Sequence, residues 1–293
     1  MLHVPVLLKE TIEILDPKPG EIFIDATFGG GGHAKEILKN ILPNGKLLAI
    51  DWDKDTVEKA KKNIVFQKPE VKLEIGNYAD LPKIMEKLNF PKADGMLLDL
   101  GFLSDQMESG KGFSFLKDEP LDMRFSQNGD LAAAQVVNSF SEKELADIFF
   151  KYGEERFSRQ IAKEILKERK RKRILTTFEL VEIIKKAVPK NYERGRINPA
   201  TRVFQALRIY INSELENLET VLGEVSEILK PGGRIAIISF HSLEDRIVKN
   251  RFKDLEREGK AKILAKKPIT AGQEEIKNNP KSRSAKLRAL YKF

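Results

Sequence analysis

The amino-acid sequence predicts an α/β fold in which a doubly wound, mostly parallel sheet is interrupted by an inserted all-helical domain. Apolar strand-like segments alternate with helical segments over the first hundred residues, then cease, and return near residue 230. Such alternation favours right-handed crossovers and a sheet covered on both faces. We therefore expect residues 1–103 and 200–293 to form one domain and residues 104–199 to form the insertion.

The elements of the first part follow from apolar periodicity. Strands are expected at 21–27, 46–51, 71–75 and 95–100, and helices at 33–40, 55–66 and 81–88. Short apolar runs between polar turns are typical of strands buried on both faces. The fourth strand therefore leads directly into the predicted insertion.

Two capping boxes mark helix starts in the insertion, Ser141 with Glu144 and Thr176 with Glu179. A basic run at 167–173 lies between the two helices, and it indicates either a solvated helix end or a nucleic-acid contact. After the insertion, a long helix over 201–229 is expected to end at the turn Lys230–Gly233. A strand at 234–240, a helix at 244–258 and a basic tail complete the chain.

The composition limits the chemistry. The chain has no cysteine and only three histidines, which excludes disulfides and a cysteine nucleophile and argues against a metal site. No apolar run has the ~18–20 residues of a membrane span, and no signal-peptide pattern begins the chain, so we expect a cytoplasmic protein. The net charge of +8 favours a polyanionic partner such as nucleic acid. The oligomeric state is not predicted.

A glycine-rich loop after the first strand marks a candidate cofactor site. Gly29, Gly31 and Gly32 allow positive φ and close approach of a ligand to the backbone. Free amides at the start of the following helix favour an electron-rich ligand group. The spacing Gly29-x-Gly31-x-x-Ala34 also fits a dinucleotide fingerprint, so the loop alone leaves NAD and S-adenosylmethionine open.

Acidic residues at strand ends bear on this choice. Asp25, inside the strand before the loop, offers a carboxylate to a methionine ammonium, where a dehydrogenase typically has an apolar residue. Asp51 ends the second strand, where a carboxylate accepts ribose hydroxyls of either cofactor. The Lys230–Gly233 turn before an apolar strand recurs in methyltransferases of this fold. Together these features favour S-adenosylmethionine and a methyltransferase.

Two more residues belong to the predicted site. Tyr78, just past the third strand, is placed either to lie against the adenine or to pack at the rim. Asp99 ends the fourth strand, at the edge where open sheets bind ligands. A buried carboxylate needs a partner; for Asp99 we expect the substrate amine or, alternatively, a helix amide.

Several motifs along nearly the whole chain carry a resemblance to a known family. They are His3–Leu8, Asp25–His33, Leu98–Gly101, Gly112–Phe115, Pro120–Arg124, Arg196–Arg202, Phe240–Arg246 and Asn279–Arg288. These motifs resemble the bacterial small-subunit ribosomal RNA cytosine-N4 methyltransferases, also called the MraW or RsmH family. The resemblance implies a Rossmann-like class I methyltransferase fold, S-adenosylmethionine as cofactor and N4-methylation of a cytidine in 16S ribosomal RNA. It maps the cofactor contacts to Gly31, Gly32, His33, Asp51, Tyr78, Asp99 and Gln106.

The chain departs from the family pattern after Gly101. Phe102-Leu103-Ser104-Asp105 stands where the family usually has Val-Ser-Ser-Pro, and this change affects the substrate side of the expected pocket. Amine methylation depends mainly on positioning. We expect Asp99 and the backbone carbonyls of 100–101 to line the amine. His241 is expected to orient it or accept a proton, with a packing role as the alternative.

Basic residues are expected to hold the RNA through its phosphates. The candidates are Arg194, Arg196, Arg202, Lys281, Arg283, Lys286 and Arg288. We expect the insertion to recognise the RNA of the small ribosomal subunit; for the tail, an ordinary charged surface is the alternative. Two other functions stay open, a non-catalytic RNA-binding ribosome assembly factor and an NAD-dependent oxidoreductase.

Overall fold

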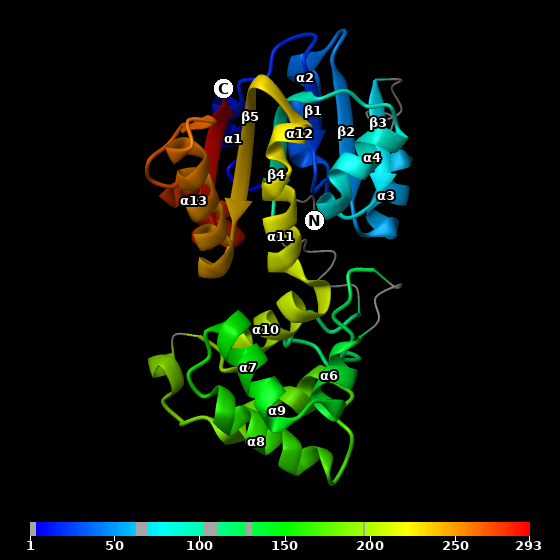
Figure 1. The fold of residues 1–293 in the computed structure, drawn as a ribbon. Helices are drawn as coiled ribbons and strands as arrows, with labels where there is room; N and C mark the ends of the chain where they lie inside the picture. Colours follow the sequence, from blue (N-terminus) through cyan, green and yellow to red (C-terminus); the bar gives the residue numbers. More distant parts are fainter. Residues whose placement is uncertain (1–3, 63–69, 102–109, 127–130, 196) are drawn as a thin grey trace. The chain divides into compact units, whose positions relative to one another are not determined.

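The computed structural model describes residues 4–62, 70–101, 110–126, 131–195 and 197–293. The chain divides into two compact units, one formed by Met1–Gly101 with Leu215–Phe293 and the other by Phe102–Glu214 (Figure 1). The return to the first unit lies later than the expected boundary at residues 199–200. The difference is α10 (Ala200–Asn212), which the structure assigns to the helical unit.

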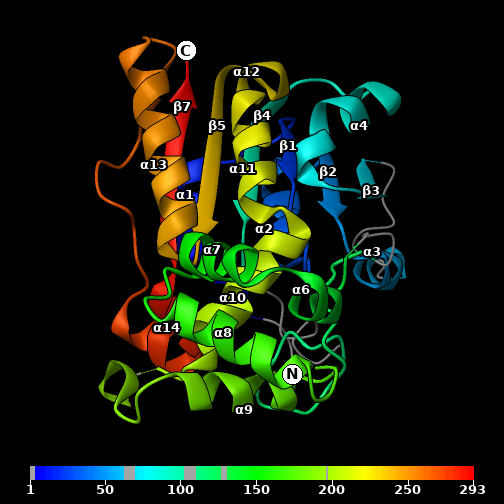
Figure 2. The ribbon, with the colours of Figure 1, turned by 60° about the horizontal axis from the view of Figure 1, so that its bottom comes forward.

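Within the described residues, the first unit is built on a seven-stranded sheet of order β3-β2-β1-β4-β5-β7-β6. The strands β1 to β5 are parallel to one another, whereas β7 runs antiparallel to both β5 and β6. Figure 2 shows β5 and β7 pointing in opposite directions. The strand order reverses beside β1, and ligands of open α/β sheets bind at the carboxyl edge of such a point. The strands are β1 (Ile22–Asp25), β2 (Lys46–Asp51), β3 (Val71–Ile75), β4 (Ala93–Asp99), β5 (Leu229–Ser239), β6 (Ala261–Ile263) and β7 (Lys286–Lys292).

Alternate residues of each strand enter two separate cores, because successive side chains of a strand point to opposite faces. Ile24 and Met96 belong to one core, while their neighbours Phe23 and Leu97 belong to the other. The first core is covered by α4 (Leu81–Lys87), α11 (Glu214–Gly223), α12 (Val225–Ile228) and α13 (Ser242–Arg257). The second is covered by α1 (Leu8–Leu15), α2 (Gly32–Ile41) and α3 (Lys54–Lys61). Burial on both faces explains the uninterrupted apolar runs in the strands.

The second unit is helical in its described part, apart from an isolated bridge between Pro120 and Thr176. Its predicted capping boxes are formed, since Ser141 and Thr176 each accept the amide three residues ahead. The helices are α6 (Ala133–Ser139), α7 (Glu142–Gly153), α8 (Ser158–Arg169), α9 (Thr177–Ala187) and α10. None of the helices in the described part of the chain is long and apolar enough to cross a membrane.

The basic run at the end of α8 is largely engaged inside this unit. Arg169 donates to the carbonyl oxygens of Val137 (3.0 Å) and Phe140 (2.6 Å), where α6 ends. Basic side chains stabilise the free carbonyls of a helix terminus. Other cations of the run have acidic partners, namely Lys167 with Glu164, Arg171 with Glu168 and Lys172 with Glu179. These contacts favour a structural role over nucleic-acid binding for these residues.

The prediction of one continuous helix over 201–229 is wrong, because the structure has three helices there, α10, α11 and α12. Ser213 takes the left-handed conformation with φ of 48° and ends α10. The side chain of Asn212 donates to the Met123 carbonyl (2.8 Å) and accepts from the Phe125 amide (2.9 Å). Bonds to a segment 89 residues away therefore accompany the break, and no local pattern predicts them.

The basic tail is also more ordered than predicted, since it supplies β7 and, with it, the pairing for β5 and β6. The predicted turn Lys230–Gly233 lies inside β5 rather than before the strand. There the register with β4 shifts between Ala93 and Gly95, so the extra residues are accommodated as an irregularity of the strand.

Candidate active site

The loop between β1 and α2 has a shape that requires glycine. Gly29 and Gly31 have φ of 54° and 72°, a region that side chains other than glycine rarely adopt. At Gly32, an added Cβ would lie 2.9 Å from Cγ of Pro5, so the N-terminal segment packs directly on the loop. The helix α2 starts at Gly32, and the first amides of a helix have no partner within it. The predicted loop is thus built for close backbone contact with a ligand.

Asp25, Asp51 and Asp99 are the last residues of the three neighbouring strands β1, β2 and β4. The sequence predicts this for Asp51 and Asp99, whereas it places Asp25 inside a strand that continues to Thr27. They lie near enough to one another that the charges of Asp99 and Asp51 raise the pKa of Asp25. A cluster of carboxylates beside a glycine loop attracts a ligand that combines a cation with hydrogen-bond donors. The carboxyl edge of the sheet is therefore a negatively charged, acceptor-rich surface.

Asp25 has a carboxylate oxygen that is left without a partner. The residue is 1% exposed, and its Oδ1 accepts the Thr27 amide at 3.2 Å. Its Oδ2 is buried and has no hydrogen-bond partner in the described part of the chain. Burial, reinforced by the neighbouring carboxylates, raises the pKa of Asp25 to about 7. An unpaired buried oxygen is costly, so a cationic ligand group here would relieve an existing deficit.

Asp51 connects the end of β2 to the loop. Its Oδ2 accepts the Gly29 amide at 2.7 Å, and its Oδ1 accepts the Asp53 amide at 2.8 Å. Burial raises its pKa to about 6. Because a carboxylate offers about four acceptor positions, both oxygens keep capacity for ribose hydroxyls. Tyr78 begins a short 3₁₀ helix (Tyr78–Asp80) just after β3, and the Gly76 amide donates to the Asp51 carbonyl at 2.9 Å.

Asp99 connects β4, the loop and His33. Its amide donates to Oγ1 of Thr27 at 2.6 Å, and its Oδ1 accepts the Gly101 amide at 3.1 Å. This amide belongs to Gly101, which lies outside any helix, so the contact differs from the helix amide expected as the alternative. The Oδ2 lies 3.6 Å from Nδ1 of His33. The Nε2 of His33 lies 3.0 Å from the Val6 carbonyl, which can only accept, so this nitrogen carries the hydrogen.

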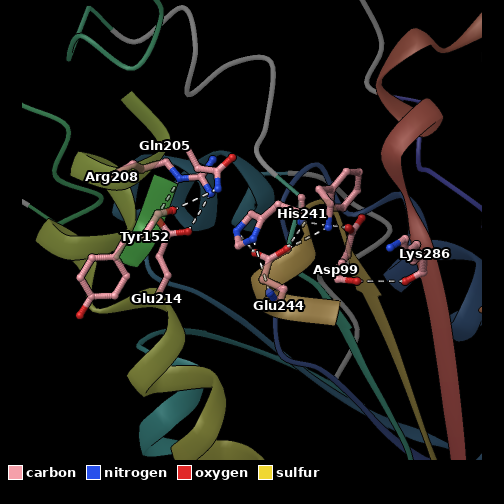
Figure 3. Close-up of polar contacts among 11 residues, drawn as sticks. Asp99, Tyr152, Gln205, Arg208, Glu214, His241, Glu244 and Lys286 are labelled. Carbon is pink, nitrogen blue, oxygen red and sulfur yellow. Dashed lines mark hydrogen bonds and ion pairs between the residues drawn. The ribbon is translucent and has the colours of Figure 1, made fainter. Parts of the chain in front are cut away.

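His241 is the N-cap of α13 (Figure 3). Its Nδ1 accepts the Glu244 amide at 3.4 Å, and the buried Glu244 carboxylate accepts the Phe240 amide at 2.8 Å. With Nδ1 accepting, a neutral imidazole carries its hydrogen on Nε2, which lies 3.1 Å from Oε1 of Glu244. The Nε2 is buried and makes no hydrogen bond with the described residues. The Nδ1 contact gives His241 a structural part as the cap of α13, and its role toward the amine stays a prediction.

The other predicted contacts fall into separate groups. Gln106, Arg196 and the segment 102–105 lie outside the described residues, and the side chain of Arg194 is not described either. Arg202 is half-buried on α10, with Nη1 at 3.4 Å from the Glu154 carbonyl. Lys281 and Arg283 are exposed on a 3₁₀ turn (Pro280–Ser284).

The prediction that Arg288 contacts RNA requires correction. Arg288 is only 9% exposed, and its Nε donates to Oδ1 of Asp245 at 2.6 Å. Lys286 donates to Oδ2 of the same carboxylate at 3.2 Å. Burial opposes ionisation of Asp245, yet these two cations hold its pKa below the usual value. The charge of Arg288 is thus compensated within the fold, and Lys286 shares the same partner.

Sequence reasoning missed the contacts that hold the N-terminal segment against the sheet unit. The Leu7 amide donates to Oε1 of Glu275 at 2.8 Å, and Nδ2 of Asn279 donates to the Val4 carbonyl at 3.1 Å. These pairs are 268 and 275 positions apart in the chain. Their one sequence signal is that Val4 and Asn279 lie in the first and last of the motifs that carry the resemblance.

A doubly wound sheet with a glycine loop and acidic strand ends at its switch point defines an α/β protein that binds a nucleotide-like cofactor. The sequence matches the MraW methylase family over residues 1–293, and the chain belongs to this family. The resemblance carried by its motifs is confirmed. A methylase family sets aside the oxidoreductase alternative.

Curated relatives match along nearly their whole length. The ribosomal RNA small subunit methyltransferase H of Syntrophotalea carbinolica is 44% identical over 98% of this chain and 97% of the relative. The protein of that name from Synechocystis is 47% identical over 98% of this chain and 92% of the relative. Among solved structures, the match to an rRNA methylase from Streptococcus thermophilus covers 100% of this chain and 99% of that one, at 10% identity and a TM-score of 0.44. This likeness is too distant to add to the assignment.

Proposed function

We propose that this protein transfers the methyl group of S-adenosylmethionine to N4 of a cytidine in small-subunit (16S) ribosomal RNA, in the cytoplasm. Membership of a methylase family and the names of its relatives support the reaction and the substrate. One structural observation supports the cofactor above all. A glycine loop is surrounded by three strand-end carboxylates, and one of them has a buried oxygen without a partner in the described part of the chain.

The residues of the loop and the strand ends fit the parts of this cofactor. Asp25 would hold the methionine ammonium, since its buried Oδ2 has no partner at hydrogen-bond distance among the described residues, although the Ala34 amide also lowers the pKa of this carboxyl group. The amides of Gly32 and His33 would face the carboxylate, because helix starts favour negative groups. The Gly31 amide donates to the Phe28 carbonyl at 2.9 Å, so Gly31 would contribute its loop shape instead. Asp51 would hold the ribose hydroxyls, and Tyr78 would lie against the adenine.

The bound cofactor supplies an electrophilic methyl group attached to a positively charged sulfur. Transfer would form the C–N bond as the C–S bond breaks, with S-adenosylhomocysteine leaving and the amine proton passing to water. Asp99 would accept a hydrogen of the amine and so orient the nitrogen lone pair toward the methyl group. Its Oδ2 lies 3.6 Å from Nδ1 of His33, so His33 borders the carboxylate without a hydrogen bond to it.

The helical insertion, with the half-buried Arg202, and the exposed Lys281 and Arg283 would bind the RNA. A base inside folded RNA must be unstacked at a cost of a few kcal/mol, and phosphate contacts could supply this energy. The insertion has its own buried core, which makes it a rigid platform for such contacts.

The test is methyl transfer from labelled S-adenosylmethionine to purified small ribosomal subunits that lack native modifications, followed by nucleoside mass analysis. We expect N4-methylcytidine from the wild type and a loss of at least about a hundredfold in turnover for Asp99→Asn. The matched control is Asp147→Asn, an exposed aspartate on α7, which should act as the wild type does.

Other outcomes identify which part of the proposal fails. Cofactor binding without any labelled RNA would support the assembly-factor alternative. Label in a nucleoside other than N4-methylcytidine would contradict the assigned atom but not the enzyme class. Full turnover and cofactor affinity of Asp99→Asn would remove Asp99 from the reaction.

A further inference from the structure

A cavity in the sheet unit, away from the strand-end carboxylates, is rimmed by basic side chains. It has a volume of about 190 Å³ and lies among α13, β6, β7 and the segment that follows β6. Its floor includes Phe252, Ile263, Ala265 and Pro268. Its cations are Lys249, Lys253, Lys266, Lys267 and Arg288, and no acidic residue of the described chain lines it. We call the first four of these cations the groove lysines.

The groove lysines lack the acidic partners that many other lysines of this protein have. Elsewhere, lysines pair with glutamate or aspartate three or four positions away, as Lys39 does with Glu36 and Lys143 with Asp147. The groove lysines are exposed, and none forms an ion pair or hydrogen bond with the described residues. Their positive charge is therefore left uncompensated.

The acids that could neutralise the groove lysines are committed elsewhere. Asp245, four positions before Lys249 on α13, binds Arg288 and Lys286 instead. Glu256, three positions after Lys253, accepts the Ile263 amide at 2.8 Å through Oε1. In addition, Lys249 and Lys253 are four residues apart on one helix face, where like charges repel. Such an arrangement costs stability, so a polyanionic ligand would relieve it.

Helix α13 leads from the carboxyl edge of the sheet to this cavity. It starts at Ser242, directly after the end of β5, and Asp99 of β4 pairs with Ile238 of β5. At 1.5 Å of rise per residue, Lys249 and Lys253 lie roughly 12 and 18 Å along the helix from its N-cap. A nucleic-acid strand that delivers a base to the carboxyl edge could therefore continue along α13.

We propose that the groove lysines bind the phosphodiester backbone of the ribosomal RNA substrate, as a second RNA contact in addition to the helical insertion. This inference rests on the proposed RNA substrate. The uncompensated charges fit phosphates, and the apolar floor fits the sugar and base between them. Arg288 lines the cavity, but its charge is paired with Asp245, so it does not itself neutralise a phosphate.

The experiment compares the variant Lys249→Ala/Lys253→Ala/Lys266→Ala/Lys267→Ala with a matched control. The control Lys9→Ala/Lys39→Ala/Lys83→Ala/Lys260→Ala removes the same charge from the same unit, at lysines that have acidic partners. Binding to purified 16S ribosomal RNA is measured over a range of salt concentrations, together with methyl transfer to unmodified small subunits. A third variant with arginine at all four groove positions keeps the charge.

We expect the groove variant to bind 16S RNA at least about tenfold more weakly than the control at low salt. The slope of log affinity against log salt is negative, and it should become less steep by about 0.7 for each phosphate that the variant no longer neutralises. The KM for subunits should rise, while kcat and cofactor affinity stay unchanged, and the arginine variant should restore binding.

An equal affinity and slope for the groove variant and the control would overturn the inference. So would weaker binding to whole subunits with unchanged binding to naked 16S RNA, because the groove would then face a ribosomal protein. If the wild type binds 16S RNA through the groove lysines but methylates no subunit, the proposed function is contradicted, while the inference that the groove lysines bind RNA still holds. If the wild type binds no 16S RNA, both fail.

Discussion

The buried carboxyl group of Asp25 makes the free energy of unfolding depend on pH. Its pKa is raised from 3.8 to about 7 by burial, so between these values the folded state holds a proton that the unfolded state has released. Stability therefore falls as pH rises through this range, by up to about 4 kcal/mol from this group. Asn at position 25 stays neutral and should escape this loss.

The prediction for Asp25→Asn has two parts. Without cofactor, its free energy of unfolding should exceed that of the wild type above about pH 7 and converge with it near pH 4, as measured by urea unfolding across pH. Its Kd for S-adenosylmethionine should rise at least about tenfold at neutral pH. Asp147→Asn serves as the exposed control. A variant that is less stable at high pH, or that binds normally, would contradict the role given to Asp25.

Cofactor binding should also release protons. Asp25 and Asp51 have pKa values of about 7 and about 6, so both are partly protonated in mildly acidic solution. A bound ammonium favours the ionised carboxylate and lowers its pKa, so the affinity should rise from about pH 5 to about pH 7. Titration calorimetry in two buffers of different ionisation enthalpy measures the protons released. A heat independent of the buffer at about pH 6.5 would exclude this linkage.

At the scale of elements, the N-terminal segment is fastened between the glycine loop and the helix α14 (Gln273–Asn278) with the residue after it. Pro5 packs on Gly32, Val6 binds His33, and Asn279 holds the Val4 carbonyl. The segment thus connects the C-terminal part of the chain to the loop of the cofactor site. Loosening it should disturb the loop without removing any cofactor contact.

The variant Asn279→Ala tests this connection. Removing the bond to Val4 should cost about 1 kcal/mol and lower the Tm by about 1–2 °C. Hydrogen exchange at residues 4–8 should accelerate, and the Kd for S-adenosylmethionine should rise by roughly threefold. The neighbouring exposed Asn278→Ala is the control. Normal exchange at residues 4–8 in Asn279→Ala would show that other contacts hold the segment.

Elements were predictable where local chemistry decides them. The strands through Asp99 and the capped helices at Ser141 and Thr176 follow from periodicity and side-chain caps. The break at Ser213 does not, because it depends on bonds from Asn212 to Met123 and Phe125. The strand β7 was missed because its basic residues suggested a surface tail, whereas Asp245 compensates two of them inside the fold.

At the scale of the whole molecule, the site was more predictable than the surfaces around it. Strand ends of a parallel sheet meet at one edge, so a strand pattern alone brings Asp25, Asp51 and Asp99 together. The roles of His241 and Arg288 depend on partners, Glu244 and Asp245, that only the folded chain brings within reach. Sequence patterns therefore indicate where charge gathers but not which charges are already paired.

The division into two units predicts where the cofactor acts. Apart from Gln106, which lies outside the described residues, the proposed cofactor contacts come from the sheet unit, and the helical unit has a buried core of its own. A ligand slows hydrogen exchange in the regions whose opening it suppresses. With S-adenosylmethionine bound, amides at 25–34, 51–53, 76–80 and 99–101 should exchange more slowly, while α7, α8 and α9 keep their rates.

The measurement is hydrogen exchange followed by mass spectrometry. At the same concentration of S-adenosylmethionine, Asp25→Asn should show weaker protection than the wild type. Equal protection of α8 and α9 would instead mean that cofactor binding is coupled to the helical unit, and the insertion would then belong to the cofactor site as well as to RNA recognition.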